Sequence, residues 1–303
     1  MKCVVTGRSP VTTRILYPDS VPELPEVETI ARGLDRRVAG DTVESVWIGS
    51  KKQPLKSPAD LIASTLEGKR IVRVHRAGKH IVFDLEGTAR PKKRGAEGPT
   101  AQWIVHLGMT GRMVVSEPAA EIVKHTHLIA KLASGRELRF IDPRMFGKLS
   151  VHLQSKSGPS GFDPGGVEPL EVSEEQFITL FRGHKTPIKS ALLNQKLLRG
   201  VGNIYADESL FRAGIRPRRR ASTLTREQLG KLHRAVREVL SEAIALGGSS
   251  ISDYVDADGE EGFFQLQHRV YGREGEPCLV CGTAIRRVVL SGRSSHYCSK
   301  CQK

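Results

Sequence analysis

The stretch from Cys278 to Cys301 reads CLVCGTAIRRVVLSGRSSHYCSKC, in which two Cys-x2-Cys pairs enclose sixteen residues. Four thiolates at this spacing can close a tetrahedral zinc site built on two turns of a hairpin. Because the protein fills all four ligand positions, the metal is expected to be structural rather than catalytic. We therefore predict one structural Zn²⁺ in a zinc-finger hairpin over residues 265–303, with the ligands Cys278, Cys281, Cys298 and Cys301.

The composition of the whole chain is consistent with an intracellular protein that binds an anionic polymer. The chain has 303 residues, of which 39% are hydrophobic, and a formal net charge of +14. This length allows two packed domains, and the basic balance favours nucleic acid as partner. Four of the five cysteines form the two close pairs, a usage typical of metal binding rather than of secreted disulfides. No apolar stretch approaches the roughly 18 residues of a membrane span, so no membrane partner is expected.

The segment that precedes the hairpin, residues 168–264, has a helical pattern. Ser173 with Gln176, and Thr225 with Gln228, match the capping box that opens a helix. The second box precedes a long apolar face at helical spacing that ends at Gly247. Residues 154–167 are rich in Gly, Pro and Ser, and we interpret them as the linker to a preceding domain.

That preceding domain, residues 22–153, has a different pattern. Apolar residues between positions 27 and 38 recur at helical spacing before Gly40. Short strands separated by Gly, Asp, Pro and Ser turns then predict an antiparallel sandwich or barrel, with a basic hairpin loop over 87–102. The fold class is therefore α+β. The expected strands include Val43–Ile48, Ile71–Val74, His80–Leu85, Trp103–Gly108, His127–Ala133 and Glu137–Ile141.

Five motifs in order resemble bacterial formamidopyrimidine-DNA glycosylase, over the chain from Pro22 to its end. The resemblance implies a helix-flanked β-sandwich, a helical domain with a helix–two-turn–helix motif, and double-stranded DNA with oxidised bases in the cleft between them. Besides the zinc hairpin, the motifs are Pro22-Glu23-Leu24-Pro25-Glu26-Val27-Glu28-Thr29, His106-Leu107-Gly108-Met109-Thr110-Gly111, Asp142-Pro143-Arg144-Met145-Phe146-Gly147 and Gly200-Val201-Gly202-Asn203-Ile204-Tyr205-Ala206.

The activity implied by this resemblance is base-excision repair. A bifunctional glycosylase and AP lyase would remove 8-oxoguanine and formamidopyrimidines through a Schiff base, and then cut the strand by β,δ-elimination. The run Leu24-Pro25 favours this purine-directed branch over the related endonuclease VIII branch, which prefers oxidised pyrimidines. Two alternatives remain. The protein could be an endonuclease VIII-like glycosylase of oxidised pyrimidines, or a lesion-binding protein without catalytic activity if Pro22 stays internal. A monomer in the bacterial cytoplasm, associated with the nucleoid, is expected.

Pro22 has the chemistry that such a reaction needs. A neutral amine can attack C1′ and leave an iminium ion, which serves as the electron sink for elimination. An α-amino group has a pKa near 8, roughly two units below that of lysine, so more of it is neutral at physiological pH. Glu23, the next residue, can protonate the deoxyribose ring oxygen as a general acid.

The position of Pro22 in the chain conflicts with this chemistry, because the nitrogen of an internal proline is an amide. We interpret residues 1–21 as an extension that is non-native or removed, with translation starting at a GTG codon at position 21. Without residues 1–20 the chain loses three basic residues and one acidic residue, so its charge becomes +14 − 3 + 1 = +12. Alternatively the extension is real and is cleaved, or it silences the enzyme.

The remaining site residues are assigned by the resemblance. Lys79 would assist β-elimination, and Arg293 would grip phosphates and take part in δ-elimination. An everted base leaves a void that apolar wedges and a planar cation can fill. Tyr205, Asp207 and Glu208 are expected to serve packing and solvation. The void-filling residues would be Met109, Arg144 and Phe146, and the phosphate-contacting residues His125, Lys185 and Asn203.

Overall fold

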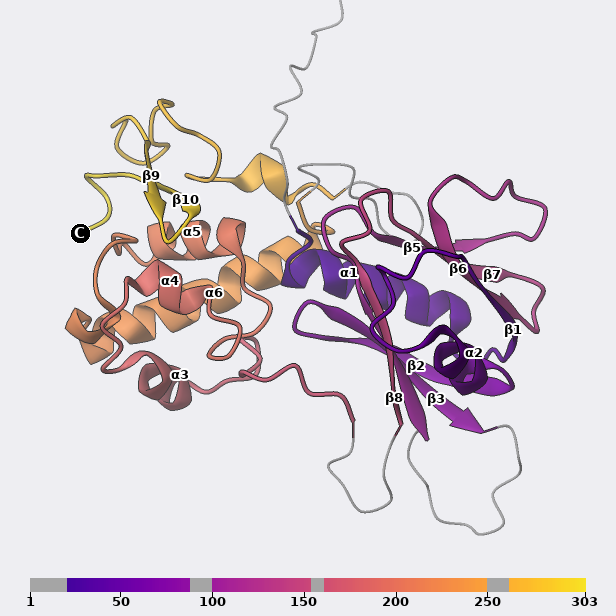
Figure 1. Cartoon of the computed structure of the whole chain (residues 1–303). Helices are drawn as coiled ribbons and strands as arrows, with labels where there is room; N and C mark the ends of the chain where they lie inside the picture. The colour runs from indigo at the N-terminus through magenta and orange to yellow at the C-terminus, as the bar shows by residue number, and fades with distance from the viewer. Residues whose placement is uncertain (1–20, 88–99, 154–160, 250–261) are drawn as a thin grey trace, which may run out of the picture.

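A computed structural model describes residues 21–87, 100–153, 161–249 and 262–303, and Figure 1 shows their arrangement. Three features expected from the sequence fall wholly or partly outside these residues. They are the N-terminal extension, most of the basic loop and the first half of the linker. No helix in the described ranges is long and apolar enough to cross a membrane.

The N-terminal domain is a β-sandwich of two antiparallel four-stranded sheets, as predicted. One sheet has the order β1-β6-β7-β5 and the other β2-β3-β4-β8. Their facing side chains form one core, in which Phe83 and Trp103 stack with ring centroids 4.7 Å apart. The elements are α1 Leu24–Val38, β1 Val43–Ile48, α2 Ala59–Leu66, β2 Lys69–Ala77, β3 His80–Gly87, β4 Ala101–His106, β5 Arg112–Ser116, β6 Thr126–Leu132, β7 Glu137–Ile141 and β8 Lys148–Leu153.

Helix α1 joins the sandwich to the second domain. Its apolar face, which includes Val27, Ile30 and Leu34, belongs to the sandwich core, whereas Leu24 belongs to the core of the helical domain. The helix begins where the Glu26 carboxylate accepts a hydrogen bond from Glu23 N at 2.9 Å. The first turn of α1 is therefore fixed at the junction of the two domains (Figure 1).

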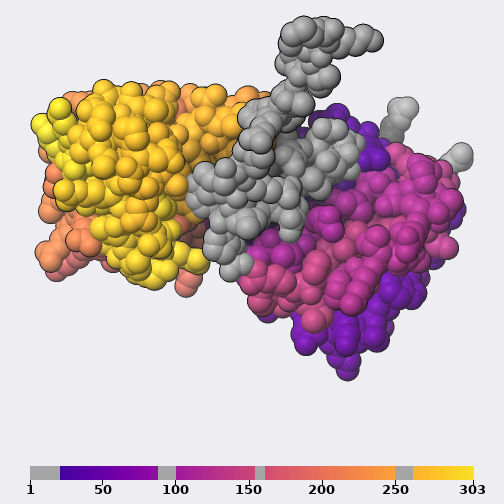
Figure 2. Space-filling model, turned by 90° about the horizontal axis from the view of Figure 1, so that it is seen from above, coloured from indigo at the N-terminus to yellow at the C-terminus, as the bar shows by residue number. Residues whose placement is uncertain are grey.

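The C-terminal domain is helical and carries a two-stranded hairpin. Both capping boxes are confirmed, since Ser173 Oγ and Thr225 Oγ1 each accept a hydrogen bond at 3.2 Å from a glutamine three residues later. The hairpin lies over the helices (yellow in Figure 2). The elements are α3 Glu174–Phe181, α4 Ile188–Leu192, α5 Asn203–Arg212, η1 Ala221–Thr223, α6 Arg226–Ala245, η2 Phe264–Gln267, β9 Arg286–Leu290 and β10 Arg293–Tyr297. The α+β fold class is confirmed.

A buried ion-pair network fixes the β2–β3 turn against the second domain. Arg76 in β2 donates to both Glu168 oxygens at 2.8 Å and to Glu28 of α1 at 2.8 Å. Glu168 also accepts from Gly78 N at 3.1 Å and from Arg199 at 2.9 Å. The turn that carries residue 79 is thus anchored to both domains.

Candidate active site

The carboxyl group of Glu23 lies where the first turn of α1 meets the start of α5. It is 4% exposed, and its Oε1 accepts a hydrogen bond from Ile204 N at 3.1 Å. Leu24 N donates to Gly200 O at 3.0 Å, which locks the two segments together. A Cβ atom at position 202 would lie 2.2 Å from Glu23 Cδ, so Gly202 leaves the room that the carboxyl group occupies.

Burial changes the acidity of Glu23. The loss of hydration raises its pKa to about 7, against the lowering effects of Lys79 and of the Ile204 and Tyr205 amides, while Glu26 adds to the rise. Near neutral pH a large fraction of this carboxyl group therefore carries a proton. Its Oε2 atom is buried and lacks a hydrogen-bond partner in the described part of the chain. Glu23 thus has the acidity and the geometry of a general acid.

Pro22 lies two residues before α1, next to the N-cap residue Glu23, and is half-buried. Pro22 is the sequence neighbour of Glu23, whose backbone N donates a hydrogen bond to the Glu26 carboxylate at 2.9 Å. With Val21 attached the Pro22 nitrogen is an amide and has no nucleophilic lone pair.

Lys79 and Arg293 reach the same site from two other elements. Lys79 lies in the β2–β3 turn, one residue before β3 begins. Burial lowers the pKa of its ammonium group, Glu23 and Glu26 raise it, and the charge of Arg293 lowers it again. The charges of the carboxyl pair and of Arg293 therefore all act on the Lys79 ammonium group. Arg293 is exposed at the start of β10.

Asn203 connects the zinc hairpin to this site. It is the first residue of α5, and its Nδ2 donates to Ser294 Oγ at 3.2 Å. The structure therefore brings together Pro22, Glu23, Lys79, Asn203 and Arg293, which come from four separate parts of the sequence.

A second group of predicted residues surrounds Asp142. Its carboxylate accepts hydrogen bonds from Thr110 Oγ1 at 2.5 Å and from Gly147 N at 2.7 Å. Its backbone N donates to His125 O at 3.0 Å. The fully buried Asp142 thus ties together the loops that present the expected void-filling residues and His125. Sequence reasoning gave it no role, although an acidic residue directly after a buried strand is a signal that could have found it.

The expected void-filling residues lie at the surface of these loops. Phe146 is 48% exposed, and the Arg144 guanidinium lies 4.9 Å from the centroid of the Phe146 ring. Met109 is half-buried and stands outside the sandwich core. His125, at φ 69°, is exposed. Lys185 is exposed in the segment before α4, apart from this cluster along the chain. An exposed aromatic ring with a cation stacked on it can insert between bases.

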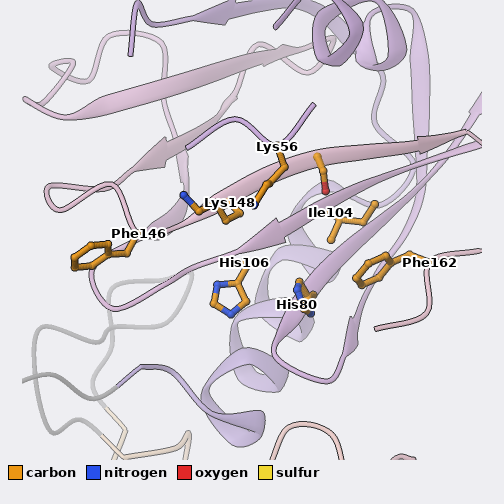
Figure 3. A pocket seen from close by; sticks show the side chains of 8 residues that line it. Lys56, His80, Ile104, His106, Phe146, Lys148 and Phe162 are labelled. Carbon is orange, nitrogen blue, oxygen red and sulfur yellow. The ribbon is translucent and has the colours of Figure 1, made fainter. Parts of the chain in front are cut away.

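A pocket of about 290 Å³ opens beside Phe146 on the outer face of the β2-β3-β4-β8 sheet (Figure 3). The imidazole rings of His80 and His106 line it, with centroids 5.0 Å apart. Burial lowers the pKa of both rings, to about 4 for His106, so they are neutral at physiological pH. His80 directly follows Lys79, so the pocket lies next to the turn that carries this lysine. Sequence reasoning did not single out either histidine.

The four predicted zinc ligands converge at the base of the hairpin. Their Sγ atoms all lie within 4.8 Å of one another, with 3.9 Å between Cys278 and Cys301 and 3.5 Å between Cys281 and Cys298. Tetrahedral coordination with Zn–S bonds of about 2.3 Å requires sulfur separations of about 3.8 Å. The thiols therefore fit one Zn²⁺, and the predicted structural zinc site is confirmed.

Comparison with known protein families accounts for almost the whole of the described chain. The formamidopyrimidine-DNA glycosylase N-terminal domain matches residues 21–149, and the H2TH domain of the same family matches residues 166–255. A zinc finger found in FPG and IleRS matches residues 275–303. The three matches follow one another in the order of the sandwich, the helices and the hairpin.

Individual relatives match over nearly the same span. The formamidopyrimidine-DNA glycosylase of Solibacter usitatus is 46% identical, over 93% of this chain and all of its own length. The MutM (FPG) protein of Thermus thermophilus has a similar structure, with a TM-score of 0.77 and 40% identity over 93% of this chain and 98% of its own. A point mutant of Lactococcus lactis FPG, in complex with DNA containing Fapy-dG, has a TM-score of 0.81 and 32% identity. The match covers 93% of this chain and 100% of the Lactococcus chain. The wild-type Lactococcus protein was also solved with DNA containing an oxidised pyrimidine.

Proposed function

The chain belongs to the formamidopyrimidine-DNA glycosylase family, and from this premise we propose that it removes oxidised purines from duplex DNA and then cuts the strand. The substrates would be 8-oxoguanine and formamidopyrimidine residues. The observation that carries the proposal is Glu23, a buried carboxyl group whose pKa of about 7 keeps a proton available beside Pro22. The bacterial relatives support a site of action on the nucleoid in the cytoplasm.

The reaction begins with attack of the Pro22 nitrogen on C1′ of the damaged nucleotide. The glycosidic bond breaks and the departing base takes up the proton that the Pro22 nitrogen loses. Glu23 gives its proton to the deoxyribose ring oxygen as the bond between this oxygen and C1′ breaks and the ring opens. The product is an iminium ion between Pro22 and C1′. The lack of a hydrogen-bond partner for Glu23 Oε2 among the described residues supports this oxygen as the one that carries the proton.

Strand cleavage follows from the acidity that the iminium ion gives to C2′. Loss of a C2′ proton expels the 3′ phosphate, and a second elimination expels the 5′ phosphate. Lys79 is held at the site by the anchored β2–β3 turn and has a lowered pKa, both of which suit assistance to the first elimination. Arg293 supplies a fixed positive charge for the phosphates that leave.

The DNA duplex would lie across both domains. Phe146 and Met109 would fill the void left by the everted base, and Arg144 would face the orphaned cytosine. Asn203 at the N-terminus of α5, together with His125 and Lys185, would hold backbone phosphates. The zinc ion has no chemical step in this scheme, since it holds the hairpin that carries Arg293.

The proposal requires Pro22 to be the first residue of the active protein. One protein would be expressed from codon 21, with its methionine removed, and a second from Met1. Each would be mixed with a duplex carrying 8-oxoguanine opposite cytosine, and borohydride would reduce any iminium ion to a stable covalent adduct. Mass spectrometry would report the adduct and the mature N-terminus.

We expect an adduct on the chain that begins at Pro22 and none on the intact longer chain. Pro22→Gly on the short chain, which keeps a free α-amine, should retain trapping at a reduced rate. An adduct on a lysine, or DNA binding without an adduct in both proteins, would refute the assignment of Pro22 as the nucleophile.

Oxidised pyrimidines are the second candidate class of substrate. The observation that favours them is the Lactococcus relative, whose structure was solved with DNA containing an oxidised pyrimidine. Excision rates from 8-oxoguanine and thymine glycol duplexes, compared at equal enzyme concentration, would rank the two classes. A faster rate on thymine glycol would reverse the proposed preference.

A further inference from the structure

We propose that Lys189 is a positioning residue, whose buried ammonium group holds the Arg293–Ser294 segment of the zinc hairpin in the geometry needed for δ-elimination. The inference rests on the proposed function, because it takes Arg293 to be the residue that acts on the phosphate. Lys189 itself lies in α4 and is only 1% exposed, so it does not reach DNA.

Lys189 and its partner Asp207 contact the backbone of β10 at two points. Lys189 Nζ donates to Ser294 O at 2.6 Å and pairs with Asp207 Oδ1 at 2.7 Å. The other oxygen of Asp207, which is 0% exposed, accepts from His296 N at 2.8 Å and lies 3.3 Å from His296 Nδ1. One ion pair from α4 and α5 thus fixes alternate residues of the strand that begins with Arg293.

The residue that Lys189 holds also contacts the start of α5. Ser294 Oγ accepts the hydrogen bond from Asn203 Nδ2 at 3.2 Å. At the other end of the turn, Ser190 and Ser291 hydroxyls lie 3.0 Å apart, so α4 holds the hairpin on both sides of Arg293. The charges of Glu23 and Arg293 both act on the Lys189 ammonium group, the first raising its pKa and the second lowering it.

A buried ion pair of this kind is expensive to desolvate and often adds nothing to stability over apolar side chains of the same size. Three elements and two backbone groups converge on it nevertheless. We therefore infer that the ion pair serves to fix the position of Arg293 rather than to stabilise the folded protein. Burial of the ammonium group also excludes a direct contact with phosphate.

The test compares Lys189→Met with the double variant K189M/D207N, which leaves no uncompensated buried charge. Both would be made on the chain that begins at Pro22, alongside Arg293→Gln as a benchmark and Lys231→Met, an exposed lysine of α6, as control. Each protein would act on a duplex with a preformed abasic site. The readouts are the rate of borohydride trapping, the rates of the β and δ products, and the zinc content.

We expect both Lys189 variants to keep their zinc and a trapping rate within about threefold of the parent. Their δ-elimination rate should fall by ~10²-fold, since a displacement of about 1 Å at a reacting group has this effect. K189R, which keeps a cation, should recover part of the lost δ-elimination rate.

Unchanged δ-elimination in the double variant would overturn the proposal. Loss of zinc in every Lys189 variant would also overturn it, because the ion pair would then serve only to stabilise the fold. Unchanged δ-elimination in Arg293→Gln would instead refute the proposed role of Arg293.

Discussion

Gly202 packs directly against the carboxyl group of Glu23, so that a Cβ atom at position 202 would lie only 2.2 Å from Glu23 Cδ and 2.4 Å from its Oε1. Gly202 caps α5 with φ −128°, an extended backbone that any residue can adopt. The glycine is therefore required by the close approach of the acid and not by the backbone conformation. Two segments almost 180 residues apart meet here without a gap, with Ile204 N donating to the same carboxyl group.

Gly202→Ala tests this contact. The methyl group must displace Glu23 while the backbone stays unstrained, so we expect excision to slow by ~10²-fold. Single-turnover excision of 8-oxoguanine measures the loss, and thermal unfolding monitors the fold. The matched control is Gly87→Ala, where a new Cβ would meet Lys69 Nζ at an ordinary 3.7 Å. Equal activity of the two variants would show that the acid does not need its present position.

The raised pKa of Glu23 predicts how stability depends on pH. The folded chain holds this proton up to about pH 7, whereas the ordinary pKa of a glutamate carboxyl group is 4.5. Between these two pH values the folded state binds more protons than the unfolded state, so the free energy of unfolding falls as the pH rises. At roughly 1.4 kcal/mol per pKa unit, the decrease is about 3 kcal/mol. Denaturant unfolding at a series of pH values would measure it.

Glu23→Gln serves as the reference for that measurement. The amide has a similar shape and does not titrate, so the decrease between pH 4.5 and 7 should be absent while excision falls steeply. A variant that shows the same pH dependence as the parent would assign the decrease to another group. Glu208 is then the group to examine, since burial raises its pKa as well.

Removal of the zinc tests the hairpin as a unit. Cys281→Ser should abolish zinc binding and release β9 and β10, because the small cluster around the thiols lacks a large core of its own. We expect DNA affinity and δ-elimination to fall together, while the β-sandwich keeps its circular dichroism signal. Cys3→Ser, made on the chain from Met1, is the control and should leave the zinc content at one ion per chain.

The sequence alone located the residues whose role follows from chemistry and spacing. The two Cys-x2-Cys pairs define a zinc site by their spacing, and the two capping boxes define helix starts by local hydrogen bonds. Such features depend on neighbours within a few residues, which the sequence displays directly.

Features that depend on contacts between residues far apart in the chain could not be predicted from the sequence. Asp207 was expected to serve packing and solvation. The structure shows it fully buried in an ion pair, because α4 brings Lys189 and β10 brings His296 onto it. Burial also sets the acidity of Glu23, and its extent depends on packing between two domains.

Asp142→Asn tests the coupling between the two void-filling loops. The Asp142 carboxylate accepts from Thr110 Oγ1 and from Gly147 N at once, and a carboxamide can accept with only one of its two terminal atoms. One loop should therefore lose its anchor, and Phe146 and Met109 should no longer share a fixed arrangement. We expect at least a tenfold loss of affinity for a duplex with an abasic-site analogue, and a smaller loss for undamaged DNA, because wedge insertion matters only at the lesion.

Fluorescence anisotropy with both duplexes measures the ratio of the two affinities. The variant Asp60→Asn, at an exposed residue of α2, controls for the lost charge. Equal losses on the two duplexes would show that Asp142 supports general DNA binding and not the insertion of the wedge.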